Sequence, residues 1–281
     1  MDILFFGDMV GRPGREAVTH YLTHLRSEGL MPDIVIANAE NTTHGFGINR
    51  RHYNELMTAG VDILTGGNHI WDRQEIFEFI DEADRLLRPD NFPAHAPGQG
   101  GGVFTIEKNG KTHTLGVMNL IGQVFMGNYN SPWDSLERLL PALKAQTPVV
   151  FLDIHAEATA EKMCMAHFAA TMGLSAMVGT HTHCQTADNR IIAGQLGYIT
   201  DAGFNGAYNS IIGMEPEGSI KRLRDQLPAR LGVAEATSLQ VNAVRFTVES
   251  RTGVCQRVRR INTILDLSGY PADIPLGEAC P

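Results

Sequence analysis

The sequence is short of cysteine, of basic residues and of long apolar runs. Its cysteines, Cys164, Cys184, Cys255 and Cys280, form no CxxC pair and no dense framework, which favours a reducing cytoplasm. A formal net charge of −8 argues against a general nucleic-acid-binding surface, which needs a basic stripe. No uninterrupted apolar run approaches the roughly 20 residues of a membrane helix. The opening "MDILFFGDMV" lacks a basic leader and reaches an acidic residue too soon for a signal peptide. We therefore expect a cytoplasmic protein with no stable binding to nucleic acid or membrane.

Apolar residues make up 43% of the 281-residue chain, which is enough for a sizeable core. In the first third, β-branched or apolar runs alternate with amphipathic stretches. This βαβαβ pattern predicts a mostly parallel sheet covered by helices. The expected strands are 2–8, 33–41 and 62–69, and the expected helices are 14–29, 50–60 and 73–87.

Beyond a Pro/Gly loop the pattern changes to strand pairs. The "NG" at 109–110 predicts a hairpin within 101–120, and a helix over 131–146 is expected to begin with Ser131 as N-cap. A buried strand at 148–155, a helix at 158–173, a strand ending near 183 and three β-rich segments follow. Residues 205–235 carry weak signals and are left unassigned. We expect a single α/β domain over 1–281, with two packed sheets and helices outside.

Polar residues follow five of the expected strands. The carboxyl ends of strands are where ligand sites form in parallel α/β sheets. The side chains there are hard or borderline ligands for a divalent cation, and none is a cysteine. They are Asp8, Glu40, Asn41, Asn68, His69, His155, His181 and His183. A lone strand-end Asp or a lone GNH is readily explained as a cap or a turn, but together these residues predict a metal site, with a hydrogen-bonded polar cluster as the alternative.

The order of these motifs resembles the calcineurin-like metallophosphoesterases. The "GNH" and "GTHTH" motifs carry the resemblance, while the usual D-x-H has Val10 in place of histidine and "NAENT" replaces the usual G-D-x-x-D. With "GDMVGRPGR" and "GGNHIWD", these departures are similar to the YmdB-type branch of that superfamily. The resemblance implies a four-layer α/β/β/α sandwich of two packed mixed sheets flanked by helices.

The resemblance also implies a two-metal centre. Asp8, Asn41 and His183 are expected to bind one ion, with Glu40 bridging to the second. The second ion's shell is completed by Asn68, His155 and His181, while His69 is expected to face the substrate as general acid. The mixed nitrogen and oxygen shell favours iron or manganese, with zinc and magnesium as alternatives.

The implied reaction is hydrolysis of a small phosphodiester by a hydroxide bridging the two ions. A 2′,3′-cyclic or a 3′,5′-cyclic nucleotide is the expected substrate, and nothing in the residues selects a base. Phe46, Phe125, Met126 and Tyr129 stand in loops that could wall the pocket, although ordinary loop packing is the favoured interpretation, so no substrate-binding residue is assigned. Arg12, Arg15, Asp72 and Asp153 lie near the motifs and are candidates to orient the histidines.

Two other functions remain open at this point. A phosphomonoesterase could use the same metals, although a doubly charged monoester would want more Arg or Lys nearby. A non-catalytic or slow metal-binding regulatory protein is the second alternative, and the full ligand set with an intact His69 argues against it. The sequence leaves a homo-oligomer open.

Overall fold

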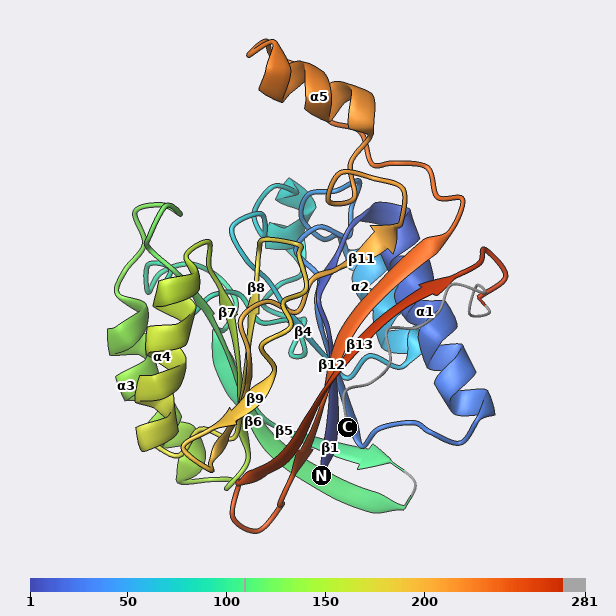
Figure 1. Ribbon diagram of the computed structural model, residues 1–281. Helices are drawn as coiled ribbons and strands as arrows, with labels where there is room; N and C mark the ends of the chain where they lie inside the picture. The colour runs from blue at the N-terminus through green and yellow to red at the C-terminus, as the bar shows by residue number, and fades with distance from the viewer. Residues whose placement is uncertain (109, 270–281) are drawn as a thin grey trace.

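Two mixed β-sheets form the centre of the protein, and helices cover both outer faces. The computed structural model describes residues 1–108 and 110–269. Figure 1 shows the sheets between one pair of helices, α1 (Gly11–Ser27) and α2 (Arg50–Ala59), and a second pair, α3 (Pro132–Lys144) and α4 (Thr159–Thr171). The predicted α/β fold of two packed mixed sheets flanked by helices is confirmed.

The first sheet has the strand order β2–β11–β12–β1–β3–β4, with β13 on the free side of β12. β1, β3 and β4 run parallel, and β12 is antiparallel to β1. The carboxyl ends of β1, β3 and β4 therefore meet at one edge. The strands are β1 (Asp2–Phe6), β2 (Asp8–Met9), β3 (Ile34–Asn38), β4 (Ile63–Thr65), β11 (Phe204–Ala207), β12 (Leu239–Val248) and β13 (Cys255–Leu265).

The second sheet has the order β5–β6–β7–β8–β10–β9. Its central strands run parallel, while β5 and β9 are antiparallel edge strands. The strands are β5 (Gly101–Lys108), β6 (Lys111–Ile121), β7 (Val150–His155), β8 (Ala176–Thr180), β9 (Arg190–Ile192) and β10 (Leu196–Ile199). β5 and β6 are the two arms of the hairpin predicted from the "NG" pair.

Strand periodicity explains how the layers stack. Successive side chains of β1 point to opposite faces, so Ile3 and Phe5 enter the core between the two sheets, whereas Leu4 and Phe6 enter the core under the first helix pair. Phe5 stacks on Phe151 of β7 with ring centroids 5.4 Å apart. A third core lies between the second sheet and α3 and α4. All three cores consist of buried apolar residues, and they hold the carboxyl edges of both sheets side by side.

The helix signals are confirmed where the sequence carries caps. The Ser131 side chain accepts a hydrogen bond from the Asp134 amide at 3.2 Å, as predicted for the start of α3. α2 begins at the cap Asn49 and ends at Gly60, whose φ of 107° suits glycine.

The helix predicted over 73–87 is wrong. Only a short 3₁₀ helix, η1 (Gln74–Glu78), forms there. The backbone of the following residues bonds to β4 and to the loop beyond: the Leu64 amide donates to the Arg85 carbonyl, and the Leu87 amide donates to the Leu64 carbonyl, both at 2.8 Å. These backbone amides and carbonyls bond to residues far away in the sequence, so they are not available for the hydrogen bonds of an α-helix.

The unassigned segment 205–235 contains most of β11 and the helix α5 (Pro216–Arg224). Most of the C-terminal tail lies outside the described residues. Among the helices that the structure describes, none has the length and apolar character needed to cross a membrane.

Candidate metal centre

The strand-end residues of both sheets meet at one place. Asp8 lies in β2 and Glu40 follows β3, while His155 is the last residue of β7 and His181 comes directly after β8. Asp8, Glu40 and His155 are at most 1% exposed. The site is therefore built where the carboxyl edges of the two sheets touch.

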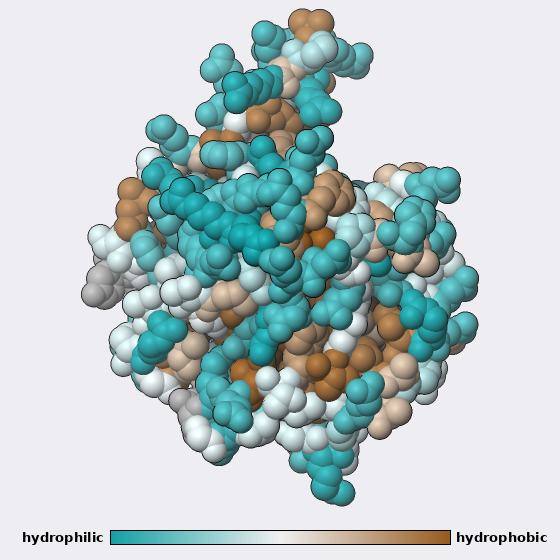
Figure 2. Space-filling model, turned by 180° about the vertical axis from the view of Figure 1, so that it is seen from behind, coloured by the Kyte–Doolittle hydropathy of each residue, from teal (hydrophilic) through white to brown (hydrophobic). Residues whose placement is uncertain are grey.

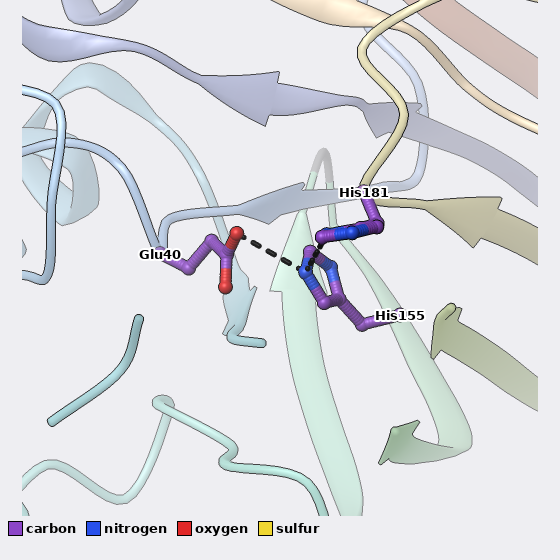
Figure 3. A group of neighbouring side chains, drawn as sticks. All are labelled: Glu40, His155 and His181. Atoms are coloured by element: carbon purple, nitrogen blue, oxygen red, sulfur yellow. Dashed lines mark hydrogen bonds and ion pairs between the residues drawn. The ribbon is translucent and has the colours of Figure 1, made fainter. Parts of the chain in front are cut away.

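Three acceptor atoms converge on one nitrogen of His155. Its Nε2 lies 2.9 Å from Asn68 Oδ1, 3.1 Å from Glu40 Oε1 and 3.0 Å from His181 Nδ1. Figure 3 shows Glu40 and His181 approaching this nitrogen from separate loops. A single N–H proton is shared poorly among three acceptors, whereas a cation accommodates several donors at once.

The other nitrogen of each ring has a partner that sets its orientation. His155 Nδ1 donates to the Thr180 hydroxyl at 3.0 Å, and that hydroxyl donates to Asp153 Oδ1 at 2.8 Å. His181 Nε2 lies 3.2 Å from Glu157 Oε2. Hydrogen bonds of this kind fix ring orientation and tautomer in metal sites. They leave His155 Nε2 and His181 Nδ1 directed at the shared centre.

A second group of unpartnered atoms lies beside the first. Asp8 Oδ1 and Asn41 Oδ1 are buried and accept no hydrogen bond from the described residues. The Asn41 amide is oriented by its NH₂ group, which donates to the Gly45 carbonyl at 2.9 Å. His183 Nε2 lies 4.0 Å from Asp8 Oδ1, and its Nδ1 donates to the Ile212 carbonyl at 2.9 Å.

The two histidines of "GTHTH" lie beyond the strand. β8 ends at Thr180, and His181 and His183 have φ values of 101° and 61°, in the left-handed region. They are thus not placed by strand alternation, and each ring faces a different part of the site.

Burial and mutual proximity shift the pKa values of the side chains at the site. Burial raises the pKa of Asp8 above its usual value. Burial would also raise the pKa of Glu40, but the neighbouring His155 lowers it to about 2. Burial opposes the charged form of His155, but Glu40, with Asp8 and Asp153, raises the pKa of His155 to about 9. Burial and the nearby His155 lower the pKa of His181 to about 3. The Asp153 carboxyl behind the site is buried, which raises its pKa to about 7.

The donor set fits divalent cations. It consists of carboxylate, amide and imidazole atoms without thiolates, and two of its oxygens are buried without a hydrogen-bond donor. Glu40, His155 and His181 each offer a ligand atom within 4.8 Å of the others. Gly67 makes room for this group, since a Cβ there would lie 2.1 Å from Glu40 Oε2 and 2.5 Å from His155 Nε2.

His69 borders the site without joining the convergent group. Its amide donates to Glu40 Oε2 at 3.1 Å, which ties its backbone to the centre. Its ring Nδ1 lies 2.8 Å from Asp72 Oδ2, and its ring contacts Phe46 edge-on with centroids 5.0 Å apart. Asp72 thus orients His69, the role for which it was a candidate.

The other sequence candidates have varied roles. Asp153 acts on His155 through Thr180 rather than by direct contact. Arg15 is buried and donates to the Thr42 carbonyl at 2.5 Å, whereas Arg12 is an exposed partner of Glu16. Of the four residues considered as possible pocket walls, Phe46 contacts His69, Tyr129 packs edge-on against Phe92, Phe125 is 88% exposed and Met126 is partly exposed.

Three further contributors to the site were not predicted from the sequence. Glu157 is an acidic residue two positions after His155, and this short spacing could have marked it as a candidate partner of the histidines. The Ile212 carbonyl lies in the segment left unassigned. A buried pair, Lys162 and Asp201, fixes the loop between the two histidines: Lys162 Nζ lies 2.8 Å from Asp201 Oδ2, which also accepts from the Thr182 amide and hydroxyl.

The fold and the site together define a metallophosphoesterase: two packed mixed sheets whose adjacent carboxyl edges gather carboxylate, amide and imidazole donors. Comparison of this chain with known proteins shows which family of metallophosphoesterases it belongs to. A family model described as "YmdB-like protein" matches residues 4–261. The chain belongs to the YmdB-like family, whose metallophosphoesterase fold implies divalent metal ions.

Individual relatives agree with this assignment. The chain is 41% identical over 261 residues to the 2′,3′-cyclic-nucleotide 2′-phosphodiesterase of Bacillus subtilis (strain 168), covering 93% of this chain and 96% of the relative. The crystal structure of a novel phosphatase from Mycoplasma pneumoniae superposes with a TM-score of 0.84 at 33% identity, covering 95% of this chain and 94% of that one. The 5′-nucleotidase from Candida albicans SC5314 shares the fold alone, with a TM-score of 0.56 at 13% identity over 95% of this chain and 52% of that one.

Proposed function

We propose that this protein is a dinuclear metal-dependent phosphodiesterase that hydrolyses 2′,3′-cyclic nucleotides. The observation that carries the proposal is the convergence of Glu40, Asn68 and His181 on His155 Nε2, beside two buried unpartnered oxygens. The Bacillus subtilis relative, a 2′,3′-cyclic-nucleotide 2′-phosphodiesterase, supports the choice of substrate. Water would be added across the bond from phosphorus to the 2′ oxygen, leaving a 2′-hydroxyl and a 3′-phosphate.

We assign the ligands as the family resemblance implies. Asp8, Asn41 and His183 would hold one ion, Glu40 would be shared between the two, and Asn68, His155 and His181 would complete the ligands of the second. When bound, two divalent cations supply positive charge for the phosphoryl oxygens and lower the pKa of water held near them.

The charge balance favours a diester. Asp8 and Glu40 offset about two of the four positive charges that the ions bring, and the amide and neutral imidazole ligands add none. The hydroxide nucleophile would bring the remaining charge to about +1, which suits a singly charged phosphodiester without a basic protein surface. This agrees with the formal charge of −8 on the chain.

His69 supplies the proton for the leaving oxygen. Asp72 accepts the hydrogen bond from its Nδ1 and fixes the ring, so that Nε2 carries the proton to the 2′ oxygen as the ester bond breaks. A positioned general acid contributes a factor of about 10² to 10⁴ in rate.

Iron or manganese is the proposed occupant, because the shell mixes oxygen and imidazole donors, with zinc or magnesium as substitutes. We place the enzyme in the cytoplasm, consistent with the few cysteines of its sequence, which form no CxxC pair.

The test is hydrolysis of 2′,3′-cyclic AMP by manganese-loaded protein. Chromatography then shows whether the product is 3′-AMP or 2′-AMP. 3′,5′-cyclic AMP and p-nitrophenyl phosphate are the comparison substrates. Glu40→Gln and His69→Gln are the test variants, and His95→Gln, an exposed loop histidine, is the matched control.

We expect 3′-AMP as product, loss of activity and metal in Glu40→Gln, and a fall of about 10² to 10⁴ in kcat with metal retained in His69→Gln. Preferred turnover of p-nitrophenyl phosphate would identify a phosphomonoesterase instead. No turnover by protein that holds two metals per chain would overturn the enzymatic proposal and favour a regulatory protein.

A further inference from the structure

The loop that follows β6 begins beside the metal centre. It comprises residues 122–130 and is called here the β6–α3 loop. β6 runs parallel to β7, and Ile121 is paired with His155, so the loop leaves the sheet next to an assigned metal ligand. Figure 1 shows it in green at the upper left of the view, above α3. Its sequence, "GQVFMGNYN", contains two aromatic residues and no charged one. An uncharged loop of this kind suits the neutral part of a substrate rather than its phosphate.

Hydrogen bonds hold both ends of the β6–α3 loop. The buried Glu161 of α4 accepts a hydrogen bond from the Gln123 amide at 2.8 Å, and the Gln123 side chain donates to the Tyr129 carbonyl at 2.7 Å. At the other end, the Asn91 side chain donates to the Asn130 carbonyl at 2.8 Å. Compact surface loops whose ends are tied together are frequently functional. The shape of this loop is therefore set by the protein itself, before a ligand binds.

Phe125 stands at the tip of the loop in a costly conformation. The Met126 amide donates to the Gln123 carbonyl at 3.3 Å and closes a turn, in which Phe125 has a φ of 62°. A positive φ at this place in a turn favours glycine. The ring gains little packing in return, because Phe125 is 88% exposed. Ordinary loop packing thus does not explain Phe125, and backbone strain at an exposed residue is typical of a functional site.

Tyr129 stands at the foot of the loop and faces the metal centre. Its ring packs edge-on against Phe92 with centroids 5.3 Å apart, and Phe92 contacts Trp71, the residue before Asp72, at 5.7 Å. Within residues 1–108 and 110–269 the Tyr129 hydroxyl has no hydrogen-bond partner. Burial, and then the negative charges of Glu40 and Asp72, raise the pKa of Tyr129. The hydroxyl therefore keeps its proton and is free to donate it to a ligand.

We propose that the β6–α3 loop is the nucleoside subsite of the enzyme: Phe125 stacks on the base of the substrate, and the Tyr129 hydroxyl donates a hydrogen bond to an oxygen of its cyclic phosphate. This proposal rests on the proposed function and adds the part of the chain that recognises the nucleoside. Stacking on an aromatic ring is tolerant of sequence, because every base has a π-face. The subsite should therefore accept all four bases.

The alternative occupant of an exposed aromatic ring is a partner protein. Interfaces with proteins are typically marked by a broad apolar patch. On the face of the described chain that Figure 2 draws, hydrophobic residues lie in small groups separated by hydrophilic ones. A single ring on a short neutral loop, beside a metal centre, fits one base better than it fits a protein surface.

The experiment compares two substrates that differ only in the base. They are 2′,3′-cyclic AMP and the 2′,3′-cyclic phosphate of methyl riboside, each hydrolysed by the manganese-loaded full chain. The test variants are Phe125→Gly and Tyr129→Phe, and Phe125→Trp is the conservative variant that keeps an aromatic ring. The matched control is Phe168→Ala, which removes a ring that is 36% exposed near the C-terminal end of α4.

We expect Phe125→Gly to raise KM for 2′,3′-cyclic AMP by about 5- to 150-fold, the loss found when an aromatic ring that stacks on a base is removed. Its kcat, and its KM for the methyl riboside, should stay near the wild-type values. Its Tm should be unchanged or higher, because glycine adopts a positive φ without strain. Phe125→Trp should restore most of the affinity, and Phe168→Ala should behave as wild type.

Tyr129→Phe should raise KM for both substrates by about 2- to 10-fold, because both carry the phosphate that the hydroxyl binds. An effect on 2′,3′-cyclic AMP alone would contradict this role of Tyr129.

Equal losses of Phe125→Gly on both substrates, with a lowered Tm, would show that Phe125 only supports the loop and would overturn the proposal. An unchanged KM for 2′,3′-cyclic AMP would overturn it as well and assign the ring to another contact, such as a partner protein. Calorimetric titration with 3′-AMP separates this result from failure of the proposed function. If protein that holds two metals hydrolyses neither substrate, the proposed reaction is wrong, and the subsite stands only if Phe125→Gly raises the Kd for 3′-AMP.

Discussion

The buried pair of Lys162 and Asp201 offers the sharpest test of how the histidine loop is held. Lys162 is 0% and Asp201 1% exposed, and their Nζ and Oδ2 atoms are 2.8 Å apart. The change we consider is Lys162→Met, which keeps the volume of the side chain and removes its charge. Asp201 then remains as a buried carboxylate without its cation.

Removing one partner of a buried ion pair costs about 3–5 kcal/mol in the free energy of unfolding. Asp201 keeps three other donors, the amide and hydroxyl of Thr182 and the amide of Gly203. We therefore expect a loss near the lower end, about 3 kcal/mol. For a chain of this size that corresponds to a fall in Tm of roughly 6–12 °C.

Urea unfolding followed by circular dichroism measures the effect. The set is Lys162→Met, Asp201→Asn and the double variant, with exposed Lys111→Met as the control. The double variant should lose less than the sum of the single losses, because neither charge is left alone. Metal content should also fall in Lys162→Met, since Thr182 lies between His181 and His183. A loss below about 1 kcal/mol, with a full metal complement, would refute this account of the pair.

Three further predictions follow from the same packing. Gly67→Ala should abolish metal retention and activity, since its Cβ would lie 2.1 Å from Glu40 Oε2. Inductively coupled plasma mass spectrometry of the purified variant measures the metal content, and normal metal content would contradict the prediction. The control is Gly102→Ala, whose Cβ would meet nothing nearer than 3.5 Å. Chelation of bound metal should lower the Tm, because the buried ligands lose the cation that offsets their charge; scanning fluorimetry with and without chelator tests this, and an unchanged Tm in protein shown to lose its metal would count against it. Burial raises the pKa of Cys255 to about 11, so iodoacetamide at pH 8 should label exposed Cys164 and spare Cys255 until the protein unfolds. Labelling of Cys255 in the folded protein should keep rising towards pH 11, because the thiolate is the reactive form. Peptide mass spectrometry measures both thiols, and equal labelling in the folded protein at pH 8 would contradict this prediction.

Local sequence patterns were sufficient to predict most of the strands and helices. β1 could be read from its apolar run and α3 from Ser131 and Pro132, because period, caps and turn residues act within a few residues of themselves. The helix predicted over 73–87 failed because the amides and carbonyls near Leu86 pair with β4, which is remote in sequence. That the chain is one domain stays a prediction.

The sequence by itself determined which ligand types were available and that each stands at the carboxyl end of a strand, whereas the structure divides these strands between two sheets whose carboxyl edges meet. Only the tertiary structure decided which atoms face the centre. Ring orientation depends on partners far along the chain, Thr180 for His155 and the Ile212 carbonyl for His183, and the loop between the histidines depends on Lys162 and Asp201. Hydrogen-bond geometry of this kind leaves no local periodicity in the sequence, because it is set by how the two sheets and α4 pack against one another.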